Sequence, residues 1–182
     1  MTAPSVDSRR VAVPALAGAA VAVALGVYAQ AHDPSGETPY KLFFTTTLNF
    51  KVWFATLAVL LAGVQLLTAL RMYGKLGSGP QPSWLGDLHR LSGTLAFLVS
   101  LPVAYHCLWS LGFQSGDTRV LAHSLLGCAF YGAFVAKVLV VRSSGLPGWA
   151  LPVVGGLTFT VLVGVWLTSS LWFFTTVDFP GI

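Results

Sequence analysis

Two histidines are the residues of this chain best placed to do chemistry. His106 and His123 flank a short polar break at 112–116, each within a long apolar run. So short a connection makes the two runs antiparallel helices, and each imidazole then lies eight or nine residues from the midpoint near Ser115. At about 1.5 Å per helical residue, their depths differ by only an ångström or two. Histidine is the commonest metal-binding side chain, and two imidazoles across a helix bundle can hold a heme iron from both sides. We therefore predict one bis-histidine heme b, with both residues as iron ligands.

Other interpretations of this pair stay open. Two neighbouring histidines can form a structural polar pair, bonded to each other or to a serine, or take part in a different metal site or a proton path. Zinc and copper normally take more ligands than two. Cys107 follows His106 directly, so it points about 100° away around a helix and is poorly placed to join it.

The composition determines which elements must position the pair. The 182 residues are 55% apolar and only 9% charged, with a mean hydropathy of +0.75, so the chain is an integral membrane protein. Crossing a hydrocarbon core of about 30 Å takes roughly 20 helical residues. Five apolar runs are long enough: 11–30, 48–70, 91–112, 120–141 and 149–174. We expect an all-α bundle of five helices forming one transmembrane domain over residues 1–182, with any chemistry inside the bundle or at its rims.

Lysine and arginine positions predict the orientation. With a cytoplasmic N-terminus, seven of these residues lie on the inner side and three on the outer side, as the positive-inside rule favours. The C-terminus is then outside, and His106 and His123 lie near the outer face. The pI of about 9.3 reflects anchoring to anionic lipid in the cell membrane rather than binding of nucleic acid. The first run, at about 20 residues, exceeds the apolar core of a signal peptide, so we interpret it as a helix.

A second pattern repeats in the two central runs. His89 and Gly93, and His123 and Gly127, both read His-x-x-x-Gly. Residues four apart share a helix face, so the glycine leaves a gap where a flat porphyrin can approach the backbone. Close packing between membrane helices favours glycine equally well.

The segment around His89 carries a family resemblance. The residues from Leu88 to Leu98 read Leu-His-Arg-Leu-Ser-Gly-Thr-Leu-Ala-Phe-Leu, and Tyr105-His106 follows further along the same run. This arrangement resembles the histidine-bearing helix of ferric reductase-like transmembrane domains and of related-looking b-type cytochromes. The resemblance covers 87–142 and implies bundled helices that hold heme b by paired histidines.

A second heme is not expected. His89 and His106 are 17 residues apart, which leaves them about 100° out of phase on a straight helix, although Pro102 between them adds a kink. The inner half of the fourth run has no histidine, and the second and fifth runs have none. We therefore place His89 and Gly93 at a rim site that caps the helix or takes an anionic or quinone headgroup. His/Met ligation with Met72 is the alternative, and Asp87 is the expected cap.

These features predict an electron-transfer component rather than a self-contained enzyme. The chain has no GxGxxG fingerprint, no P-loop and no Cys-x-x-Cys-His sequence. We expect electrons to pass between a quinol or a partner redox subunit and an outer acceptor, and the sequence predicts no oligomeric state. Groups expected to surround the heme are Tyr105, Ser110, Gln114 and Ser124. The alternatives are a cofactor-free membrane anchor or accessory subunit, and, less favoured, a transporter, which the almost purely apolar fifth run argues against.

Overall fold

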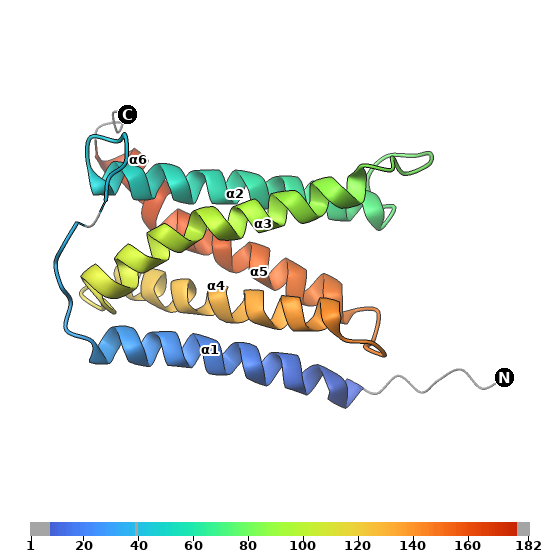
Figure 1. The fold of residues 1–182 in the computed structure, drawn as a ribbon, viewed down its shortest axis with the longest axis horizontal. Helices are drawn as coiled ribbons and strands as arrows, with labels where there is room; N and C mark the ends of the chain where they lie inside the picture. Colours follow the sequence, from blue (N-terminus) through green and yellow to red (C-terminus); the bar gives the residue numbers. More distant parts are fainter. Residues whose placement is uncertain (1–7, 39, 178–182) are drawn as a thin grey trace. The chain divides into compact units, whose positions relative to one another are not determined.

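The computed structural model describes residues 8–38 and 40–177, and all regular structure within them is helical (Figure 1). Five helices of this described part are long and apolar enough to cross a membrane: Ala12–Ala31, Thr47–Met72, Leu85–Leu111, Thr118–Arg142 and Ala150–Thr176. Each has at least 20 residues, which matches the thickness of a hydrocarbon core. The predicted all-α fold with five membrane-spanning helices is confirmed. The predicted orientation concerns the two chain ends. Residues 1–7 and 178–182 lie outside the described residues.

Several of these spans are built from more than one helical segment. The elements in chain order are η1 (Ser8–Val11), α1 (Ala12–Ala31), α2 (Thr47–Met72), α3 (Leu85–Tyr105), η2 (His106–Leu111), α4 (Thr118–Arg142), α5 (Ala150–Trp166), η3 (Leu167–Leu171) and α6 (Trp172–Thr176). Here η2 and η3 are π-helices, in which each backbone hydrogen bond joins residues five apart instead of four. The third and fifth spans therefore each contain a widened segment.

The chain divides into two compact units. The first contains the residues up to Asp33 together with Gly112–Val165, and so holds α1, α4 and nearly all of α5. The second contains Pro34–Leu111 and the residues from Trp166 onward, and so holds α2, α3, η2, η3 and α6.

Small residues bring α1 and α4 of the first unit into direct backbone contact. A Cβ atom added to Gly18 would lie 2.5 Å from the carbonyl oxygen of Gly132 and 2.9 Å from Cβ of Ala136. A Cβ atom added to Gly132 would lie 2.9 Å from Cβ of Ala22. Since lipid tails are as apolar as the helices, van der Waals contact of this kind is a main force holding membrane helices together. Both glycines are needed for the crossing.

In the second unit, α2 packs antiparallel against α3, and one arginine organises the loop between them. The guanidinium of Arg71 donates hydrogen bonds to the carbonyl oxygens of Leu76, Ser78, Gly79 and Pro80, at 3.0–3.2 Å. Its positive charge also lies at the C-terminal end of α2, where the helix dipole favours a cation. The loop at this end of the unit is therefore ordered by the helix that precedes it.

The start of α3 differs from the sequence-based prediction. The helix begins at Leu85 rather than at residue 91, because Leu85 is buried and adds a turn that a hydropathy window does not detect. Asp87 was expected to cap this helix, and that prediction is wrong. Trp84 occupies the cap position without a side-chain bond, and Asp87 lies in the first turn, where it pairs with Arg90. A carboxylate there is favourable to the helix dipole.

Candidate functional site

His106 is a buried histidine at the start of the π-helix η2. Its side chain is 5% exposed, and neither Nδ1 nor Nε2 has a partner among the described residues. Ser110, on the same π-helix, is 1% exposed, and its Oγ atom is equally unpartnered within that part of the chain. Each unsatisfied buried polar group costs about 1–3 kcal/mol. These two residues, within five positions of each other, make this segment the candidate site.

The local backbone explains how His106 comes to be buried. Pro102 lies inside α3 and cannot donate a backbone hydrogen bond. From His106 onward the chain continues as the π-helix η2, and the N–H of His106 lies against the carbonyl oxygens of Pro102 and Val103. A π-segment inserted in an α-helix rotates the side chains that follow it, and such segments are frequent at functional sites. Counting residues along a straight helix therefore does not give the direction of this imidazole.

An aromatic cluster lies beside His106 in the second unit. Tyr105 stacks on Trp109 at a centroid distance of 6.4 Å and on Tyr40 at 6.2 Å. Tyr40 also meets the edge of Phe50 at 5.5 Å, and its hydroxyl donates a hydrogen bond of 2.8 Å to the carbonyl oxygen of Pro102. The sequence analysis missed Tyr40, because it lies in the connection before α2, 62 residues from the carbonyl that it binds.

Burial raises the pKa of the Tyr40 hydroxyl above its ordinary value, and the neighbouring Tyr105 and Cys107 raise it further. We expect Tyr40→Phe to lower stability by about 1 kcal/mol through loss of the bond to Pro102. The pKa of Tyr40 is higher in the folded than in the unfolded state. The protonated hydroxyl therefore stabilises the folded protein fully below the unfolded pKa near 10, and this stabilisation is lost as the pH rises through the raised folded-state pKa. Apparent melting temperatures in detergent will show it: the wild type and Tyr40→Phe should differ between pH 7 and 9 and converge only once the pH exceeds the raised pKa. An equal difference at every pH would contradict this assignment.

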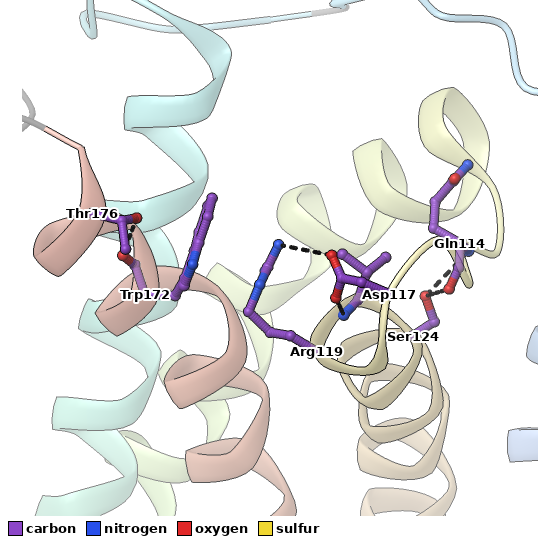
Figure 2. Close-up of polar contacts among 7 residues, drawn as sticks. Gln114, Asp117, Arg119, Ser124, Trp172 and Thr176 are labelled. Atoms are coloured by element: carbon purple, nitrogen blue, oxygen red, sulfur yellow. Dashed lines mark hydrogen bonds and ion pairs between the residues drawn. The ribbon is translucent and has the colours of Figure 1, made fainter.

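His123 lies in the first unit, on α4, and is half-buried. A Cβ atom built on Gly127 would meet nothing within 4 Å, so the backbone one turn along from His123 is accessible. Two of the groups expected around the heme lie together: the Ser124 hydroxyl bonds to the backbone of Gln114 (Figure 2). The Ser124 hydroxyl donates to the Gln114 carbonyl oxygen at 2.9 Å and accepts from the Gln114 N–H at 3.2 Å.

The helix that carries His123 has a well-defined start. The Asp117 carboxylate accepts a 2.8 Å hydrogen bond from the N–H of Val120, which is the usual N-cap arrangement, and it lies 4.0 Å from the Arg119 guanidinium (Figure 2). These contacts fix the chain immediately before His123. His106 belongs to the second unit and His123 to the first, so their pairing stays a prediction.

His89 is engaged by α2 of its own unit. Its Nδ1 atom lies 2.9 Å from the Thr68 hydroxyl, and the Gln65 amide donates to its carbonyl oxygen at 3.3 Å. The Gln65 side chain occupies the space beside Gly93 that a Cβ atom would fill. The gap expected beside Gly93 in the His89-x-x-x-Gly93 motif is therefore filled by a protein side chain. The sequence analysis did not identify Thr68 and Gln65 as partners, although two polar residues three apart on an apolar helix are a usable signal.

The described part of the chain contains no group of three or more histidine, cysteine, aspartate or glutamate side chains able to hold a metal ion. A zinc site normally takes three or four protein ligands. A heme iron takes its four equatorial nitrogens from the porphyrin, and so needs only one or two from the protein.

A family model described as "Family of unknown function (DUF6529)" matches residues 11–181, which include all five membrane-spanning helices. Neither the curated proteins nor the solved structures contain a significant match to the chain.

Proposed function

Since the chain belongs to DUF6529, a family of unknown function, we propose from its own residues that it is a membrane b-type cytochrome with one heme b. His106 and His123 are the proposed axial ligands, and the heme lies near the outer face of the cell membrane. When bound, the heme supplies a one-electron iron couple whose potential the surrounding protein tunes. A quinol or a partner redox subunit is the proposed source of electrons, and the N-terminus is proposed to be cytoplasmic.

The observation that carries this proposal is the burial of His106 with both ring nitrogens unpartnered within the described residues. A histidine inside a membrane is expensive to bury and normally finds a partner. Coordination to iron satisfies one nitrogen directly. It also explains why an imidazole is retained among apolar neighbours, where a phenylalanine of similar shape avoids the penalty.

The protein's own residues have separate tasks in this proposal. His106 and His123 donate to the metal, and the open backbone at Gly127 leaves room for a flat ring to approach α4. Tyr105 and Trp109 form a stacked aromatic pair on the span that carries His106. The bonds that Asp117 and Ser124 make within the first unit hold the connection before His123 in one geometry. Preorganisation of this kind keeps a ligand positioned through repeated changes of iron charge.

The test is an absorption spectrum of the purified protein, made in cells supplied with a heme precursor. We expect a reduced-minus-oxidised spectrum with the Soret, α and β bands of heme b after addition of dithionite, and a pyridine hemochrome assay giving one heme per chain. A monodisperse, full-length and colourless protein would overturn the proposal. A stoichiometry of two hemes per chain would instead indicate a second heme site at His89.

A further inference from the structure

A lysine lies at the same end of the second unit as His106. Lys51 is one turn inside α2, which begins at Thr47, and His106 is five residues before the end of the third span at Leu111. Because α2 and α3 are antiparallel, these two helix ends lie at the same side of the unit. Counted from these two helix ends at about 1.5 Å per residue, the depths of Lys51 and His106 differ by about 2 Å.

Contacts through Tyr40 bring the two backbones together. The ring of Tyr40 meets Phe50, the residue before Lys51, at 5.5 Å, and Tyr105, the residue before His106, at 6.2 Å. Lys51 and His106 therefore lie at the same end of the unit, and each directly follows a residue that contacts the Tyr40 ring.

Lys51 has no counter-ion among the described residues of its own unit. It is half-buried and makes no hydrogen bond or ion pair with any described residue. The acidic side chains that the structure describes in this unit are Glu37, which is exposed in the connection before α2, and Asp87, which pairs with Arg90 at the opposite end. An anion stabilises a half-buried ammonium group near the end of a membrane span.

We propose that Lys51 binds a propionate carboxylate of the heme whose iron His106 holds. The inference rests on the proposed function and adds to it the group that orients the porphyrin about the His106 axis. Heme b has its two carboxylates on one edge, so a cation beside the axial ligand selects which edge faces the membrane surface. The carboxylate also supplies the missing counter-ion, and a charge-assisted hydrogen bond of this kind is among the stronger polar contacts in proteins.

The experiment compares wild type, Lys51→Gln, Lys51→Arg and the control Lys41→Gln, which removes an exposed lysine from the connection before α2. Each protein is stripped of heme and reconstituted with heme b or with its dimethyl ester, which carries no carboxylate. We expect heme b to dissociate about tenfold faster from Lys51→Gln than from wild type. The dimethyl ester should dissociate from both at the same rate, and Lys51→Arg should restore retention of heme b.

A second readout is the midpoint potential of the bound heme. Removal of a positive charge near the iron favours the ferric form, so Lys51→Gln should have a lower potential than wild type, while Lys41→Gln should match wild type. Equal dissociation rates and potentials in Lys51→Gln and wild type would overturn the inference and leave the proposed function intact. An equal effect of Lys51→Gln on heme b and on the dimethyl ester would also overturn it, because the carboxylates would then play no part in the effect. A wild type that binds neither form would instead refute the proposed function.

Discussion

Replacement of His106 by glycine should abolish the heme b absorption of the purified protein, and added imidazole should restore it. The side chain is buried, and neither of its nitrogens is satisfied by the described residues, so its removal leaves a space of the right size for a free imidazole. An imidazole ligand supplied from solution can then coordinate the iron in place of the side chain. Spectra recorded with and without imidazole measure the effect on one protein sample.

The matched control for this experiment is His89→Ala. The imidazole of His89 bonds to Thr68 on α2, so its loss should lower stability slightly and leave the spectrum unchanged. His123→Gly should lose the bands in the same way as His106→Gly. Unaltered absorption in His106→Gly would exclude it as a ligand, and a monodisperse variant that imidazole does not rescue would assign the histidine a structural role.

The second large effect is expected at the contact between α1 and α4. In Gly132→Ala the added Cβ atom would press on the Gly18 carbonyl oxygen and on Cβ of Ala22, and neither neighbour is the end of a flexible side chain. The helix backbones must then separate, with a cost of at least about 2 kcal/mol. For a chain of this size, that corresponds to a fall in apparent melting temperature of about 4–8 °C.

Gly155→Ala is the control for Gly132→Ala. Gly155 lies on α5 in the same unit, and a Cβ atom added there would meet nothing within 4 Å. The substitution is chemically identical and increases helix propensity slightly. Thermal unfolding followed by size-exclusion chromatography in detergent should show wild-type behaviour for Gly155→Ala. Equal melting temperatures for both variants would contradict a tight contact at Gly132.

The number and type of the elements could be predicted because hydropathy is a sum over consecutive residues. All five predicted helices correspond to helices in the structure, and most of their ends agree within two residues. The exception is the start of α3, where the sequence between Leu85 and Arg90 is mixed in polarity. There the burial of a single leucine decides where the helix begins, and that burial depends on tertiary packing rather than on the neighbouring sequence.

The site could be predicted only in part, for a geometrical reason. From the sequence it was possible to predict that His106 lies within an apolar helix and that Gly127 can leave a gap beside His123. The three-dimensional packing was needed to find that Gln65 fills the space at Gly93, that Thr68 bonds to His89, and that Tyr40 reaches Pro102. Each residue turns a helix by about 100°, so a small rotation of one helix, or one π-segment, changes which side chains meet. That rotation is determined by the packing of separate parts of the chain, and no local stretch of sequence encodes it.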